Sequence, residues 1–148
     1  MLLTDEYIRN VSSPYLSKRC ADEHWVIDFV DVERDKLTAT IIMTQFPNSV
    51  ADKDAFHLSF ITALEIVSQL QIIYFHSWAG LNRKTMEGWM AEVTMKSSSP
   101  IRDPSAIRVE MIANRTKKLR DKYYVAATHR VYDDLGGHFE VELKTFVA

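Results

Sequence analysis

The sequence predicts an α+β fold in which an antiparallel β-sheet wraps around one long central helix. Residues 56–80 are apolar around most of a helical circumference, contain no proline and place their only glycine at the end. Segments rich in Val, Ile, Thr and aromatic residues lie before and after this stretch. Because helical segments do not alternate with these strand-like segments, an antiparallel sheet is favoured over a parallel one.

The chain before the central helix predicts a short helix and two strands. Residues 4–20 begin with Thr4, a preferred N-cap residue, and Pro14 ends the helical pattern. Residues 24–33 and 36–46 are strand-like and are joined by a polar turn. In the second of these strands apolar residues alternate with threonines, which is the two-residue period of a half-buried strand.

The chain after the central helix predicts four more strands. The first covers residues 86–97, and one of its faces carries Trp89, Ala91, Val93 and Met95. A serine-rich loop follows this strand. The last three strands span residues 106–114, 123–132 and 139–147. The predicted order is therefore two strands, one buried helix and four strands.

The polar residues of the central helix indicate that protein, and not lipid, surrounds it. Charged and amide groups are costly in a bilayer. A narrow polar stripe is formed by Thr62, Glu65, Gln69 and His76. Gln71 points away from this stripe and has apolar neighbours. A buried amide without partners costs about 1–3 kcal/mol, so Gln71 needs a partner, which the backbone, a water molecule, a second subunit or a substrate can supply.

Composition restricts the classes of function. The 148 residues suffice for a single domain, 1–148, and the net charge of −2 gives no electrostatic case for binding nucleic acid. The single cysteine, Cys20, is typical of a reducing cytoplasm and excludes an internal disulfide framework. The N-terminus lacks a secretion-signal pattern, so we expect a cytoplasmic protein. The five histidines lack metal-ligand spacing, and we expect no metal, no cofactor and no membrane span.

The predicted arrangement is that of the hot-dog fold, and residues 63–75, ALEIVSQLQIIYF, resemble the central helix of hot-dog thioester enzymes. In those helices an acidic residue commonly follows Ala-Leu. More specifically, the chain resembles the FcoT-like acyl thioesterase family. Besides the helix, the matching segments are Pro14-Tyr15 with Cys20 shortly after, Gly88-Trp89 and Arg102-Asp103-Pro104.

The resemblance implies particular site residues. Tyr15 matches a site tyrosine of the family, and Gln71 falls where the family carries a site asparagine, on a gapless match anchored at Glu65. The family's second site tyrosine, just ahead of the helix, has no counterpart, and that region contains Asp54, Phe56 and His57. The implied activity is hydrolysis of an acyl thioester carried by coenzyme A or an acyl carrier protein.

The missing tyrosine leaves two alternatives open. One is a hot-dog lyase that adds glycine or water to an unsaturated acyl thioester. The other belongs to a different class, a non-catalytic acyl-binding subunit that has kept the fold. A deep apolar tunnel beside Gln71 would favour an enzyme, and a plugged tunnel would favour the binding subunit.

The candidate catalytic residues have distinct expected roles. Helix N–H groups around Ser59 can polarise the thioester carbonyl, because they are unpaired and carry the positive end of the helix dipole. The Gln71 amide or the Tyr15 phenol can orient the attacking group. Glu65 or His57 can act as general base. The structural alternatives are that Glu65 forms a salt bridge across a dimer and that His57 is a surface residue at the helix entry.

The candidate substrate-binding residues lie on several segments, and they are Ser59, Phe60, Trp89, Arg102, Lys117 and Lys118. The basic segment 114–122 can hold the phosphates of coenzyme A or an acidic carrier protein, or it can be a solvated turn. We also expect a homodimer or a larger homo-oligomer. A six-stranded sheet around one helix leaves two edges and an apolar helix flank that a second copy would cover.

Overall fold

The structure of the protein is a computed structural model, which describes residues 6–7, 22–46 and 56–148. Of the predicted N-terminal helix, the structure describes Glu6 and Tyr7, which are helical. Tyr15, Cys20 and residues 47–55 lie outside the described residues. The elements of the described part are β1 (His24–Glu33), β2 (Lys36–Gln45), α3 (Phe60–Trp78), β3 (Gly88–Ser99), β4 (Ile107–Lys118), β5 (Tyr123–Tyr132) and β6 (His138–Val147).

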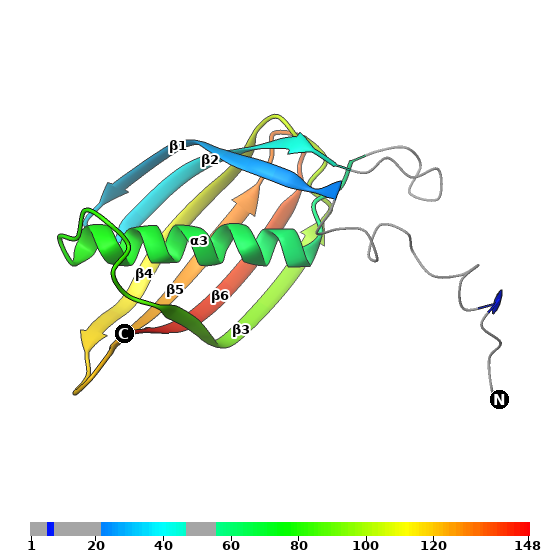
Figure 1. Cartoon of the computed structure of the whole chain (residues 1–148). Coiled ribbons are helices and arrows are strands. Elements are labelled where there is room, and N and C mark those ends of the chain that lie inside the picture. Colours follow the sequence, from blue (N-terminus) through cyan, green and yellow to red (C-terminus); the bar gives the residue numbers. More distant parts are fainter. Residues whose placement is uncertain (1–5, 8–21, 47–55) are drawn as a thin grey trace.

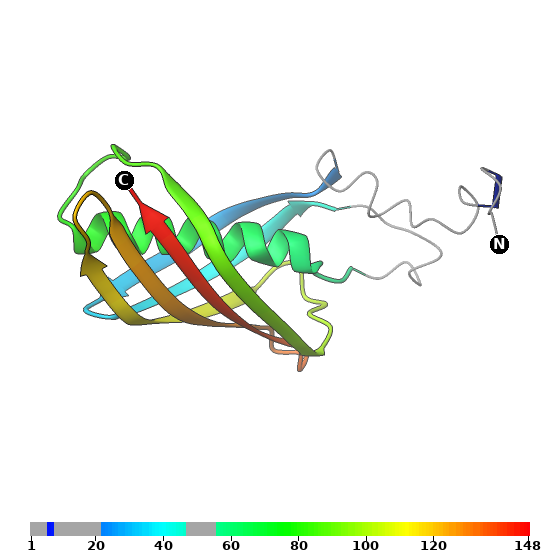
Figure 2. The same ribbon diagram turned by 90° about the horizontal axis from the view of Figure 1, so that it is seen from below.

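Within this part of the chain the strands form one six-stranded sheet in the order β1-β2-β4-β5-β6-β3. All neighbouring strands pair antiparallel. The sheet curves around α3, which crosses its concave side (Figures 1 and 2). This confirms the predicted order and the predicted wrapping of an antiparallel sheet around one long helix. It also places β1 and β3 at the two edges.

Local sequence signals fix both ends of α3. Ser59 is the N-cap residue, and its side-chain oxygen accepts a hydrogen bond from the Thr62 N–H at 3.1 Å. At the other end the helix stops at Trp78, and Gly80 adopts a positive φ of 69°. The last carbonyls are then bonded by the returning chain, because Leu81 N–H donates to the carbonyl of His76 at 2.8 Å.

The core lies between α3 and the concave face of the sheet. Alternate residues of each central strand point toward the helix, as the two-residue period of a strand requires. Fully buried positions include Leu37 and Ile41 of β2, Met111 of β4, Val125 and Val131 of β5, and Leu143 of β6. The helix meets them with Ile66, Val67, Leu70, Tyr74 and Phe75.

One face of α3 is not covered within the described residues. Glu65 and Gln69 are exposed there, and Ile61 retains 45% of its accessible surface. The prediction of a helix surrounded by protein on all sides therefore holds for the face toward the sheet and not for the opposite face. The sheet edges β1 and β3 flank this open face (Figure 1).

A β-bulge changes which side chains of β3 share a face. The pairing with β6 shifts between Met90 and Glu92, so Ala91 has no direct partner. Trp89 pairs with Phe146 on the outer face, whereas Val93 pairs with the inward-facing Leu143. The predicted common face of Trp89 and Val93 is therefore wrong, because the extra residue inverts the alternation.

The predicted end of the strand at residues 106–114 also needs correction, since β4 continues to Lys118.

Asp133 joins the loops at the N-terminal end of α3. Its carboxylate accepts N–H bonds from Arg102, Asp103, Leu135 and Gly137 at 2.7–3.1 Å. Burial alone would raise the pKa of Asp133, but these donors outweigh it and hold the pKa below the ordinary value. The carbonyl of Ile101 in the same loop accepts the Leu58 N–H at 2.9 Å, so the start of α3 is fixed on this anchor.

Candidate active site

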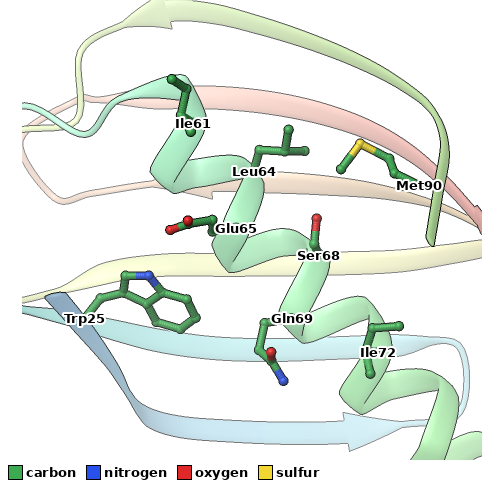
Figure 3. Close-up of a pocket in the computed structure, with 8 residues that line it drawn as sticks. All are labelled: Trp25, Ile61, Leu64, Glu65, Ser68, Gln69, Ile72 and Met90. Carbon is green, nitrogen blue, oxygen red and sulfur yellow. The ribbon is translucent and has the colours of Figure 1, made fainter. Parts of the chain in front are cut away.

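An apolar groove of about 500 Å³ runs along the open face of α3. Trp25 of β1 lines one side and Met90 of β3 lines the other, so both sheet edges contribute (Figure 3). The helix supplies Ile61, Leu64, Glu65, Ser68, Gln69 and Ile72. These positions follow the i, i+3, i+4 spacing of one helical face. The groove is therefore built by residues that are distant in sequence and meet through the fold.

Glu65 is the only carboxylate among the described residues that line this groove. It is accompanied one turn later by the hydroxyl of Ser68 and the amide of Gln69, all on the same side of α3 (Figure 3). The Ser68 Oγ atom is buried and has no hydrogen-bond partner in the described part of the chain. The groove thus combines a carboxylate that can accept a proton with two groups that can donate hydrogen bonds.

Gln71 lies on the other side of the helix and is only 1% exposed. Its Nε2 donates to the Thr145 hydroxyl at 2.9 Å and to the carbonyls of Val125 and Leu143, both at 3.3 Å. The sheet therefore supplies the partners that this buried amide needs, although Oε1 is buried without a partner among the described residues. Gln71 does not line the groove, so the structure does not bring it together with Glu65.

His129 of β5 is a second buried polar group outside the groove. Its side chain is fully buried on the concave face, and neither ring nitrogen has a partner that meets full hydrogen-bond geometry in the described residues. The Val141 backbone is close enough to favour the protonated imidazole somewhat, but burial outweighs this effect. Burial in these apolar surroundings lowers the pKa of His129 to about 4. The imidazole is consequently neutral in the folded protein at neutral pH.

The residues at the start of α3 form a compact cap. Thr62 donates from its hydroxyl to the carboxylate of the buried Glu23, and Ser59 binds the Thr62 N–H. The expected binding of the thioester carbonyl by helix N–H groups around Ser59 stays a prediction. One of these groups, the Thr62 N–H, already donates to the Ser59 side chain. His57 is half-buried just before the helix. Phe60 is largely exposed, and its ring centroid lies 5.2 Å from that of Phe139.

The remaining predicted substrate-binding residues lie away from the groove. Trp89 is on the outer face of the sheet, with its ring centroid 5.9 Å from that of Phe146. Arg102 is exposed in the loop anchored by Asp133, toward the N-terminal end of α3. Lys117 and Lys118 lie at the end of β4, with their ammonium groups 5.8 Å and 5.9 Å from the ring centroids of Tyr124 and Tyr123.

Of the predicted site residues, the groove therefore contains Glu65. Tyr15 lies outside the described residues, so its role stays a prediction. Sequence reasoning missed the groove positions of Ser68, Trp25 and Met90. Gln69 was part of the predicted polar stripe, and this stripe was the signal that could have located the groove. The contributions of Trp25 and Met90 depend on the strand order, which no local pattern reveals.

No cluster of three or more His, Cys, Asp or Glu side chains suited to a metal ion occurs among the described residues, 6–7, 22–46 and 56–148. No helix in the same ranges has the length and apolar character needed to cross a membrane.

Comparison with known proteins places the fold. No protein-family model and no curated protein matches the sequence. A solved structure of a proposed thioesterase from Lactococcus lactis matches with a TM-score of 0.55 and 10% identity, over 86% of this chain and 92% of that one. A proposed thioesterase from Shewanella oneidensis matches with a TM-score of 0.52 and 8% identity, over 97% and 98% of the two chains.

These likenesses establish the class of fold. The six-stranded antiparallel sheet wrapped around α3 is the hot-dog fold, as the sequence predicted. At 8–10% identity the matches define the fold alone. The membership in the FcoT-like family therefore remains a prediction from the resemblance.

Proposed function

We propose that the protein hydrolyses an acyl thioester in the groove along α3, with Glu65 as the general base. One observation carries the proposal: Glu65 is placed in a largely apolar groove of about 500 Å³ between the helix and both sheet edges. An apolar groove with a few convergent polar groups is the usual form of a small-molecule site. Its apolar lining suits an acyl chain, and the carboxylate suits the activation of water.

The reaction follows from these groups. The Glu65 carboxylate accepts a proton from a water molecule as the water oxygen attacks the thioester carbonyl carbon. The hydroxyl of Ser68 and the amide of Gln69 line the same groove and can donate hydrogen bonds to the negative charge that develops on the carbonyl oxygen. The carbon–sulfur bond then breaks, and the proton held by Glu65 passes to the thiolate. The products are a carboxylic acid and a free thiol.

Two independent considerations support this chemistry. The two solved structures described above are named as proposed thioesterases, and the sequence resembles thioester enzymes in the helix that carries Glu65. The carrier in this proposal is coenzyme A or an acyl carrier protein. We also propose that the protein acts as a homodimer, because the exposed apolar residues beside the groove favour a second copy as its missing wall. A cytoplasmic location is proposed on the separate ground of the single cysteine.

The proposal is tested with Glu65→Gln, which keeps the size and polarity of the side chain and removes the base. The expected result is a fall in kcat/KM of about 10²-fold or more, as for the loss of a general base. The measurement is release of free thiol from a panel of saturated acyl-CoA thioesters. Glu140→Gln is the matched control, because Glu140 is exposed on the outer face of β6 and its loss should leave kcat/KM unchanged.

The same assay decides between the alternatives. Full activity in Glu65→Gln would refute the assignment of the base. Glycine-dependent or water-dependent consumption of 2-unsaturated thioesters without release of thiol would instead support the lyase. No turnover of any thioester by the folded wild-type protein would support the acyl-binding subunit.

A further inference from the structure

The groove continues beyond the apolar part toward the C-terminal end of α3. A second compartment of about 370 Å³ shares Gln69 and Ile72 with the first, so the two adjoin. Its character differs, because its lining includes Ser77, Asn82, Arg83 and Lys84. The groove therefore changes along the helix from an apolar part with one carboxylate to a polar part with two cations.

The turn after α3 creates this polar compartment. The positive φ of Gly80 reverses the chain, and the Gly80 N–H bonds the carbonyl of Ser77 at 3.0 Å. With the bond from Leu81 to His76, the last helical carbonyls are occupied by backbone donors. The negative end of the helix dipole is therefore partly satisfied. Residues 81–84 then return beside the last turns of α3 (Figure 1).

Arg83 and Lys84 are two cations without an ion pair in the part of the chain that the structure describes. Both are exposed, and neither forms an ion pair with a carboxylate of the described residues. No aspartate or glutamate among these residues lines the second compartment. Their position distinguishes these two cations, since both line the compartment that adjoins the apolar groove. Two unpaired cations at the end of a groove make a site for an anion.

We propose that the polar compartment binds the phosphates of coenzyme A, with the pantetheine arm along α3 and the acyl group in the apolar part. The inference rests on the proposed function, since it fixes the thioester at Glu65. From Glu65 to Trp78 the helix rises ~20 Å, so the phosphates lie well away from the reacting carbonyl. Gln69, at the junction of both compartments, offers its amide to the amide-rich arm.

Coenzyme A fits this compartment better than a carrier protein. A carrier protein presents a single phosphodiester on its arm and would bind mainly through its own surface. Coenzyme A brings several phosphates, which match two cations together with the polar side chains of Ser77 and Asn82.

The test uses Arg83→Gln combined with Lys84→Gln. Binding of coenzyme A itself is measured by titration calorimetry, and KM is measured for an acyl-CoA and for the same acyl group on N-acetylcysteamine, which lacks phosphate. The double variant should bind coenzyme A at least about tenfold more weakly and raise KM for acyl-CoA similarly. KM for the N-acetylcysteamine thioester should not change. The effect should shrink at high salt.

A matched control removes the same charge elsewhere. Arg130→Gln with Lys144→Gln takes two cations from the exposed outer part of the molecule and should leave both KM values unchanged. Equal affinity of the wild type and of Arg83→Gln/Lys84→Gln for coenzyme A would overturn the inference, even if hydrolysis at Glu65 is confirmed. Weaker binding of coenzyme A by this variant would sustain the inference, even if the wild type hydrolyses nothing. Loss of turnover of carrier-protein thioesters alone, with coenzyme A binding intact, would assign the cations to a carrier protein and overturn it.

Discussion

His129 is the residue whose environment most strongly constrains its ionisation. Its imidazole is fully buried beneath α3, and burial lowers its pKa to about 4 from the ordinary 6.5. In the unfolded chain the same imidazole binds a proton near pH 6.5. The folded state therefore binds fewer protons than the unfolded state between these two pH values, and stability must fall as the pH falls through this window.

The expected loss of free energy of unfolding from His129 is about 3 kcal/mol between pH 6.5 and pH 4. His129→Leu removes the titrating group, so the free energy of unfolding of this variant should fall by about 3 kcal/mol less than that of the wild type between pH 6.5 and pH 4. Urea unfolding at a series of pH values measures it. His24→Gln, at an exposed position of β1, should keep the wild-type slope. Identical slopes for the wild type and His129→Leu would show that the imidazole is not buried as described.

At the scale of single residues, the sequence pattern indicates the lining of the groove better than the resemblance does in one respect. The helical spacing of the sequence places Glu65 and Gln69 on one polar stripe, and both residues line the groove. Gln71 was recognised as an amide alone on an apolar face, and its partners prove to be groups of β5 and β6. Those partners are more than fifty positions away in the chain, so no local pattern could identify them.

At the scale of elements, the hydrogen bonds of the Gln71 amide add a polar link from α3 to β5 and β6 within the apolar core. This contact gives a direct test of whether Gln71 is structural or catalytic. Gln71→Leu removes the hydrogen bonds together with the unpartnered Oε1. We expect the free energy of unfolding to change by less than about 1 kcal/mol, because an apolar replacement of similar size also removes the unsatisfied oxygen.

We expect kcat/KM of Gln71→Leu to stay close to the wild-type value, since the amide does not line the groove. Chemical denaturation and the thiol-release assay on the same preparation give both quantities. A fall of about 10²-fold in kcat/KM without loss of stability would restore the site role that the resemblance implies for Gln71.

The limits of the elements were predictable where a local signal exists. The helix ends at Trp78 because Gly80 follows, and this pattern is visible in the sequence. The strand β4 extends four residues beyond its predicted end. The prediction ends too early because the segment is basic, and a basic segment is typical of a solvated turn. Pairing of Lys117 and Lys118 with Tyr124 and Tyr123 keeps it in the sheet, and that pairing is a property of two strands together.

At the scale of the whole molecule, the open side combines exposed apolar residues with an unpaired strand edge. Ile61, Met90 and Val93 are all more than a third exposed, and β3 is at the edge of the sheet. Such an arrangement favours association with a second copy. The sequence alone predicted that a flank would need cover, but the identity of this flank depends on the strand order.

We therefore expect a particle of at least twice 17.1 kDa by light scattering at micromolar concentration. Val93→Glu places a charge on the inward side of the edge strand and should shift the protein toward the monomer, because burying an unpaired carboxylate is costly. Thr94→Glu, on the outward side of the same strand, is the control and should not. A monomeric wild type at this concentration would contradict the expectation.

The bulge at Ala91 sets the phase of the edge strand. Side chains of a strand alternate between its two faces, so one unopposed residue works like a frame shift that exchanges inside for outside. Before the bulge the even-numbered Met90 faces inward and Trp89 faces outward, whereas after it the odd-numbered Val93 and Met95 face inward. In a related chain that has one residue fewer or more at this point, the position of Met90 in the groove and that of Trp89 on the outer face would be exchanged. A difference of two residues would keep both positions on their faces. Comparison of related chains must therefore treat the number of residues between Trp89 and Val93 as part of the site, even where the residue types agree.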